Sequence, residues 1–144
     1  MWTMTTFRSF LTTALMLGFA FSAARAADDP LVLLPQYEQV WSALAADDLP
    51  AAKDAAQKLA TSATGLHQPG LAGTARAVAG ANDLAAAREA FKALSTRAIA
   101  LAHDAKGYFV ATCPMAQADW LQPTREIRNP YLGKAMPSCG EIKD

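Results

Sequence analysis

The sequence of 144 residues lacks the motifs by which most enzymes are recognised. It contains no G-x-S-x-G nucleophile elbow, no H-E-x-x-H metal-binding helix, no phosphate-binding loop and no C-x-x-C-H haem attachment site. A serine or cysteine hydrolase needs a histidine beside its nucleophile, and only His67 and His103 are present. The sequence therefore predicts a binding or interaction protein, not an enzyme.

The sequence also lacks an excess of charge of either sign. It carries 13 lysines and arginines against 13 aspartates and glutamates. A nucleic-acid-binding domain needs a basic stripe along the surface that follows the phosphates. We therefore expect no nucleic-acid partner.

No apolar run is long enough to cross a membrane, which takes about 20 residues as a helix. The longest run extends from Phe10 to Phe21; Arg8 precedes it, and the small-residue pattern Ala24-Arg25-Ala26 follows it. This arrangement is typical of a secretory signal peptide. We predict that residues 1–26 are removed on export to the periplasm, which leaves one domain, residues 27–144, with no stable membrane insertion. An uncleaved membrane anchor is the alternative.

The large apolar residues from Leu31 to about Ala105 recur at helical spacing. They predict helices near 34–44, 49–63, 71–79 and 83–105, with a loop over 64–70. Asp48 is a predicted N-cap, and Gly80 to Asp83 offers another before the last helix. The seam of that helix consists of Leu84, Ala87, Phe91, Leu94, Ala98, Leu101 and Ala105. This pattern predicts an all-α fold, a small antiparallel bundle of three to four helices.

The C-terminal segment, residues 107–144, differs from the rest. Its prolines at positions 114, 123, 130 and 137 forbid long helices, and Tyr108 to Val110 could form a short strand or a last helical turn. A disordered tail would rarely carry as many large apolar side chains as Trp120, Leu121, Ile127 and Tyr131. We expect an ordered irregular segment that lies over the bundle, with Trp120 and Tyr131 holding it there.

This segment also carries the residues with the most distinctive chemistry. Cys113-Pro114-Met115 and Met136-Pro137-Ser138-Cys139 each place a thiol close to a thioether. Soft sulfur ligands select Cu(I) or Ag(I), whereas zinc usually takes more cysteines or histidines. Cys113, Met115, Met136 and Cys139 are therefore candidate ligands, and His103 is a candidate auxiliary ligand.

A disulfide between Cys113 and Cys139 is the alternative interpretation, because two cysteines in an exported chain are often bonded. Such a bond would close a loop of 27 residues. On the chain-entropy estimate, it would stabilise the fold by about 3.5 kcal/mol. Met115 and Met136 would then fill gaps in the core. Spacing alone does not choose between metal and disulfide, and a disulfide would have to be reduced before both sulfurs could bind metal.

The same segment resembles a bacterial family of domains of unknown function. The resemblance lies in Cys113-Pro114-Met115-Ala116, Asp119-Trp120-Leu121, Glu126 to Met136, Cys139-Gly140 and the helical stretch from Ala86 to Ser95. It covers nearly the whole mature chain; one departure is Pro137, where a leucine is expected. Members of the family are small exported proteins or C-terminal domains of some CusB-type adaptors of copper and silver efflux pumps. The resemblance implies a helical bundle, periplasmic copper handling, and an efflux adaptor or copper-accepting protein as the partner.

Overall fold

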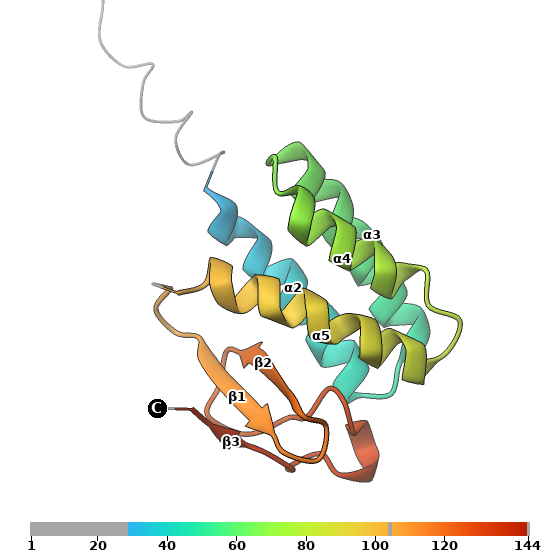
Figure 1. Ribbon diagram of the computed structural model, residues 1–144, viewed down its shortest axis with the longest axis vertical. Coiled ribbons are helices and arrows are strands. Elements are labelled where there is room, and N and C mark those ends of the chain that lie inside the picture. Colours follow the sequence, from blue (N-terminus) through green and yellow to red (C-terminus); the bar gives the residue numbers. More distant parts are fainter. Residues whose placement is uncertain (1–28, 104, 144) are drawn as a thin grey trace, which may run out of the picture.

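The computed structural model describes residues 29–103 and 105–143 (Figure 1). In these residues, four helices are followed by a small sheet. The elements are η1 (Pro30–Leu33), α2 (Leu34–Ala45), α3 (Leu49–Gly65), α4 (Pro69–Ala79), α5 (Leu84–Leu101), β1 (Phe109–Cys113), β2 (Ala118–Gln122), η2 (Gly133–Ala135) and β3 (Glu141–Ile142). The predicted signal peptide, residues 1–26, lies outside the described residues.

The helices begin where the sequence supplies partners for their first N–H groups. Asp48 Oδ1 accepts a hydrogen bond from the backbone N–H of Ala51 at 2.9 Å, and Asp83 Oδ1 accepts one from Ala86 at 2.8 Å. These first-turn N–H groups have no partner within the helix, so each carboxylate stabilises its helix start. The predicted starts of α3 and α5 are therefore confirmed.

The predicted loop over 64–70 is too long. Helix α3 extends through Gly65 and α4 already begins at Pro69, which leaves three residues between the two helices. Pro69 lies in the first helical turn, where its missing N–H costs nothing. His67 adopts a φ of 54°, which lets the chain reverse within this short connection.

The core lies between the helices, and the middle of the predicted α5 seam is confirmed. Ala87, Phe91, Leu94 and Ala98 are completely buried. Leu84 and Leu101, near the ends of α5, are only partly buried, and Ala105 lies beyond the end of the helix. Small residues on α3, namely Ala52, Ala56, Ala60 and Ala63, are also buried, which allows close helix packing.

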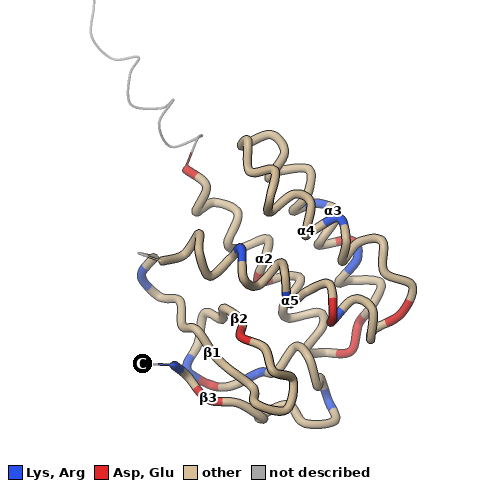
Figure 2. The backbone as a smooth tube through the Cα atoms, viewed as in Figure 1, with Lys and Arg blue, Asp and Glu red and all other residues tan. Residues whose placement is uncertain are grey.

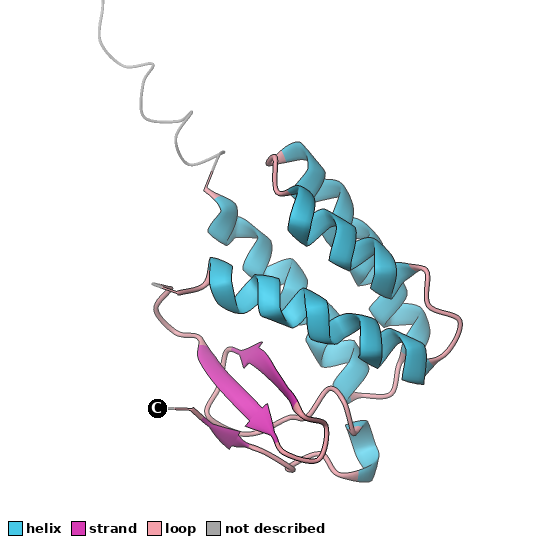
Figure 3. Cartoon of the chain, in the orientation of Figure 1, coloured by secondary structure: helices cyan, strands magenta, loops and turns pink. Residues whose placement is uncertain are grey.

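The C-terminal segment is not irregular, so the expectation of an all-α fold is wrong for this part. It forms an antiparallel sheet in the order β2-β1-β3 (Figure 3). Strand β1 has the sequence F-V-A-T-C, whose aromatic and β-branched residues favour a strand. The segment's prolines lie outside the three strands, where they remove no ladder hydrogen bond. We call residues 105–143 the cap.

The cap packs on α2 and α5 (Figure 1). Buried aromatic rings contribute to this contact. The ring of Tyr131 lies 5.8 Å from Phe91 and 5.9 Å from Trp120, measured between centroids. Tyr37 bonds Ser95 Oγ at 2.9 Å and accepts the N–H of Leu121 at 3.1 Å. The expectation that Trp120 and Tyr131 hold the segment on the bundle is confirmed for Tyr131, which packs on Phe91 of α5, whereas the Trp120 ring packs against Tyr131 within the cap.

Acidic and basic residues are interspersed along the backbone of both the helices and the cap (Figure 2). In the part of the chain that the structure describes, no basic stripe follows one element. Within the same residues, no helix combines the length and the apolar character that a membrane span requires.

Candidate functional site

The sheet brings the two cysteines together. Cys113 is the last residue of β1, and Cys139 lies two residues before β3, which pairs with β1 through Thr112 and Glu141. In this antiparallel register, positions 113 and 139 fall at the same end of the strand pair. The two Sγ atoms are 3.2 Å apart, and both cysteines are free thiols.

Gly140 allows this approach. Its φ is 138°, a backbone conformation that side chains with a Cβ rarely adopt. A Cβ at this position would lie 2.7 Å from the Thr112 carbonyl oxygen and 2.8 Å from Cη2 of Trp120. The glycine therefore lets the chain after Cys139 run close to both β1 and the Trp120 ring.

The turn from Pro114 to Gln117 surrounds the sulfur of Cys113. The N–H of Gln117 donates to the Pro114 carbonyl at 3.2 Å, and Gln117 takes a φ of 50°. Burial disfavours the charged thiolate of Cys113, but four hydrogen bonds favour it, from the backbone N–H groups of Ala116 and Met115 and from the side chains of Cys139 and Asn129. On balance, the pKa of the Cys113 thiol is lowered.

The environment of Cys139 has the opposite effect. Its hydrogen bond to Cys113, then burial, then repulsion by the Cys113 charge raise the pKa of the Cys139 thiol. The pair is therefore asymmetric, with Cys113 as the favoured thiolate and Cys139 as its thiol donor. One sulfur with increased thiolate character is useful both for metal binding and for disulfide chemistry.

Asn129 is a supporting residue that sequence reasoning missed. Its completely buried side chain donates to the Cys139 carbonyl at 2.6 Å and accepts the N–H groups of Tyr131 and Leu132 at 2.8 and 3.0 Å. Its own backbone N–H donates to the carbonyl of Pro137 at 2.8 Å. The Asn-Pro sequence indicates only a turn, whereas in the structure this amide also holds the segment that carries Cys139.

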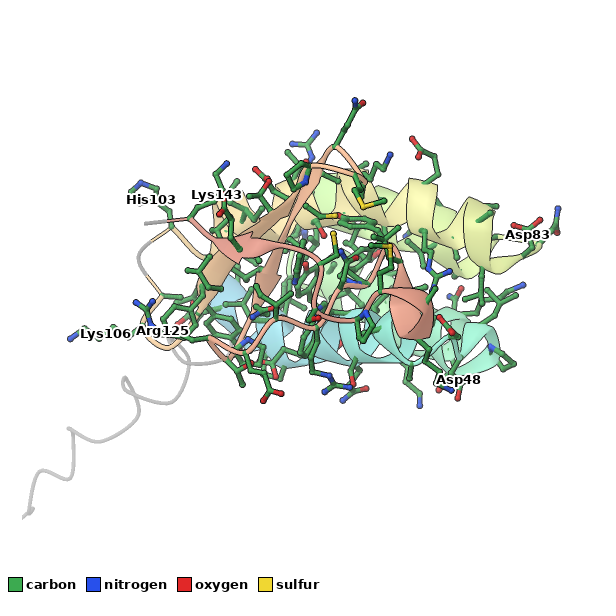
Figure 4. The ribbon with its side chains drawn as sticks, turned by 90° about the horizontal axis from the view of Figure 1, so that it is seen from below. Asp48, Asp83, His103, Lys106, Arg125 and Lys143 are labelled. Carbon is green, nitrogen blue, oxygen red and sulfur yellow. The ribbon has the colours of Figure 1, made fainter. Side chains whose placement is uncertain are left out.

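The methionines lie at the surface beside the pair. Met115 is 64% exposed and Met136 is 41% exposed, so the idea that both fill the core is wrong. Met136 belongs to the same turn as Cys139, because the Cys139 N–H donates to the Met136 carbonyl at 3.2 Å. In Figure 4, all sulfur atoms of the described residues fall in one part of the view.

His103 lies away from this group. It is an exposed residue just beyond the end of α5, and Figure 4 shows it at the edge of the molecule, far from the yellow sulfur atoms. Among residues 29–103 and 105–143, no three side chains of the His, Cys, Asp and Glu types cluster in a way that could hold a metal ion.

Two hollows flank the turn that holds Cys113, between the cap and α5. One, of about 400 Å³, is lined by Lys92, Thr96, Pro114 and Asp119 among others. The other, of about 320 Å³, is lined by Met115 together with Arg88, Glu89 and Tyr131. The Met115 side chain therefore borders a space that a small ligand or a partner side chain can enter.

The helical part of this architecture has relatives. The family model described as "Protein of unknown function (DUF3347)" matches residues 33–107, about half of the chain. No curated protein and no solved structure matches the chain significantly. The match includes α2 to α5 and ends before β1, so the two cysteines lie outside it. The chain belongs to this DUF3347 family, which confirms the predicted relation to a family of unknown function.

Proposed function

We propose that the protein binds one soft monovalent metal ion, Cu(I) or Ag(I), through Cys113 and Cys139, with Met115 and Met136 as further ligands. The observation that carries this proposal is the 3.2 Å separation of the two sulfurs. Thiolates and thioethers are the donors that Cu(I) prefers. Each cysteine has a methionine two or three residues away in the chain, so four soft donors belong to two short turns.

The separation of the sulfurs is compatible with metal binding after a small movement. Metal–thiolate bonds are about 2.3 Å long in zinc sites, and two such sulfurs at a tetrahedral angle lie about 3.8 Å apart. The observed 3.2 Å is therefore short by about half an ångström for that arrangement. A disulfide, in contrast, requires the sulfurs to approach to about 2.05 Å.

The composition of the site favours a soft ion over zinc. Structural zinc sites are completed by four cysteines or histidines. Cys113 and Cys139 are the only cysteines in the sequence, and the described residues contain no cluster of three His, Cys, Asp or Glu. The remaining donors next to the pair are the exposed thioethers of Met115 and Met136, which suit Cu(I) and Ag(I).

A periplasmic role follows from the predicted signal peptide and from the resemblance to C-terminal domains of CusB-type copper and silver efflux adaptors. In this role the protein buffers the ion or delivers it to an efflux adaptor or another copper-accepting protein. The exposure of both methionines supports transfer, because a surface thioether is accessible to a partner's ligands. No catalytic step is proposed.

A competition titration of the reduced protein against a Cu(I) chelator tests the proposal. The wild type should bind one Cu(I), and Met115→Leu and Met136→Leu should each bind it more weakly, because leucine preserves volume and removes the thioether. Cys113→Ser should lose more affinity than either. Ser138→Ala is the matched control, since it changes the turn between Met136 and Cys139 but keeps all four sulfurs. Equally poor competition by the wild type and both methionine variants would refute the site.

The second candidate is a helical interaction module of the cell envelope, held by a Cys113–Cys139 disulfide and without metal. The close approach of the two sulfurs also favours this candidate, because bond formation requires only a further movement of about 1 Å. Free thiols should be counted in denatured protein isolated from cells grown with and without copper. A metal-binding protein should yield two thiols after copper growth, whereas the stapled module should yield none in either case.

A further inference from the structure

The two cysteines differ in their access to solvent. Cys113 is completely buried, at 0% exposure, whereas Cys139 is only partly buried. The Cys113 sulfur is enclosed by the turn that follows β1, by the Asn129 side chain and by Cys139 itself. Cys139 lies in the connection between η2 and β3.

This difference matters for disulfide chemistry. A disulfide is opened by a thiolate that attacks one of its two sulfurs, and the attacked sulfur must be accessible. The Sγ atoms are already 3.2 Å apart, so oxidation requires little rearrangement of the cap around them. Cys139 is the more exposed of the two residues, since Cys113 is completely buried although it lines the hollow of about 400 Å³ beside α5. An external thiol should therefore meet Cys139 first.

We propose that Cys139 is a thiol–disulfide exchange site, at which an external dithiol reduces the oxidised Cys113–Cys139 pair and Cys113 is always the departing sulfur. This inference rests on the proposed function only for the role of the exchange, which is to return the two cysteines to the reduced form that binds metal. The exchange chemistry itself requires no metal.

The reaction balances with one dithiol per disulfide. One thiolate of the dithiol attacks Sγ of Cys139, the bond between the two protein sulfurs breaks, and its electron pair leaves with Sγ of Cys113. The second thiolate of the dithiol then attacks the mixed disulfide and releases Cys139. The pair gains two electrons, which the dithiol loses as it becomes a disulfide.

The partner that fits this surface is a protein or small molecule with a protruding dithiol. It needs to reach only the turn from Met136 to Cys139, where the Cys139 N–H bonds the Met136 carbonyl at 3.2 Å. Once the pair is reduced, the same turn presents the Met136 thioether, which is 41% exposed. Reduction and metal loading would therefore proceed from the same face.

The first experiment uses metal-free wild-type protein, oxidised and then treated briefly with a low concentration of glutathione, a monothiol that carries no second thiol in the same molecule to complete the second step. Acid quenching and alkylation are followed by peptide mass mapping. Glutathione should be found on Cys139 and the alkyl group on Cys113. Glutathione on Cys113, or failure of the pair to oxidise, would overturn the proposal.

The second experiment compares two single-cysteine variants in their reaction with oxidised glutathione. Cys113→Ser, which retains Cys139, should react at least about tenfold faster than Cys139→Ser, once each rate is divided by that of the denatured variant. Equal rates, or a faster reaction of Cys113, would overturn the proposal. The Cu(I) titration is independent of both experiments, so failure of metal binding and failure of exchange at Cys139 can be distinguished.

Discussion

The bundle and the cap are stabilised by different means. In the bundle, α2 to α5, the buried residues are almost all apolar, and many of them are alanines. In the cap, by contrast, two amide side chains, Gln122 and Asn129, are completely buried. A periodic apolar face is enough to assemble helices, whereas a chain with short strands and long loops needs specific polar partners for its backbone.

Gln122 illustrates this difference. Its Oε1 accepts the indole N–H of Trp120 at 2.9 Å, and its Nε2 donates to the carbonyls of Thr124 and Glu126 at 2.6 and 3.0 Å. Asn129 likewise donates from its side-chain amide to the backbone carbonyl of Cys139 at 2.6 Å. Buried backbone groups that lack a ladder partner are costly, so these amides hold the cap in one conformation.

The two regions are joined by Arg88 on α5. Its guanidinium donates to the Pro130 carbonyl at 3.0 Å, the Leu44 carbonyl at 3.1 Å and Asp47 Oδ1 at 2.5 Å. Asp47 also accepts the backbone N–H of Lys134 at 3.3 Å. The family match covers the bundle and stops before the cap strands. The residues of the proposed metal chemistry lie in the cap, which is the region stabilised by specific contacts.

The largest effect is expected from removing a residue that both regions share. Phe91 is completely buried, and its ring lies 5.4 Å from Tyr37 in the bundle and 5.8 Å from Tyr131 in the cap. Phe91→Ala should lower the free energy of unfolding by about 4 kcal/mol and keep both regions in one transition. Denaturant unfolding followed by helical circular dichroism and tryptophan fluorescence measures this.

The partly buried Leu101, at the end of the same helix, is the control for Phe91. Leu101→Ala should cost clearly less because its side chain is already partly in water. A midpoint that barely moves for Phe91→Ala would contradict the assigned register of α5.

A smaller effect, confined to the cap, is expected from Gly140→Ala. A Cβ there would lie 2.7 Å from the Thr112 carbonyl oxygen, and the φ of 138° is strained for alanine. The cost should be about 2–3 kcal/mol. The sulfurs should also separate, so oxidation of Cys113 and Cys139 to a disulfide should slow, while the helical signal persists. Unchanged oxidation kinetics would show that the close approach of Gly140 to the Thr112 carbonyl does not determine the distance between the two sulfurs.

Loss of the Arg88 hydrogen bonds that connect the bundle and the cap should lower the free energy of unfolding by an intermediate amount. Arg88→Ala leaves the carbonyls of Leu44 and Pro130 without a charged donor, and should cost about 2 kcal/mol. Hydrogen exchange should increase in the cap more than in α3 and α4. Equal increases in both regions would mean that Arg88 stabilises the whole domain and does not specifically join the two parts.

The same variant should change the acid dependence of stability. The hydrogen bond from Arg88 lowers the pKa of Asp47 in the folded protein. A lowered pKa adds stability that is present above the usual aspartate range, near 4, and is lost as the pH falls through the lowered value. Arg88→Ala should therefore flatten the loss of stability below about pH 4, which thermal unfolding at several pH values would show.

The smallest effect on stability is expected from Gly73→Ala. Its sign should be opposite to that of Gly140→Ala in the cap. Gly73 is exposed on α4, and a Cβ there would meet nothing within 4 Å. Alanine should stabilise the helix by about 0.8–1 kcal/mol. A rise in the thermal midpoint checks this, and a fall would reveal packing on this face of α4.

The cap illustrates where sequence reasoning ended. The four prolines correctly excluded long helices, but they did not indicate a sheet, because β1 has only five residues and β3 only two. The choice between strand and helix after Tyr108 depends on pairing with residues that come much later in the chain. The sequence around Asn129 predicted only a turn. No neighbouring residue indicates that the Asn129 side chain reaches the carbonyl of Cys139, ten positions later.

The sequence by itself determined the helices, their caps at Asp48 and Asp83, and the four sulfur-bearing residues as candidates. Helical hydrogen bonds and caps join residues within a few positions of each other, so local spacing contains that information. Only the tertiary structure decided that Cys113 and Cys139 touch, that the former is completely and the latter only partly buried, and that both methionines are exposed. These properties depend on strand pairing and on the packing of the cap against α5, which join residues far apart in the chain.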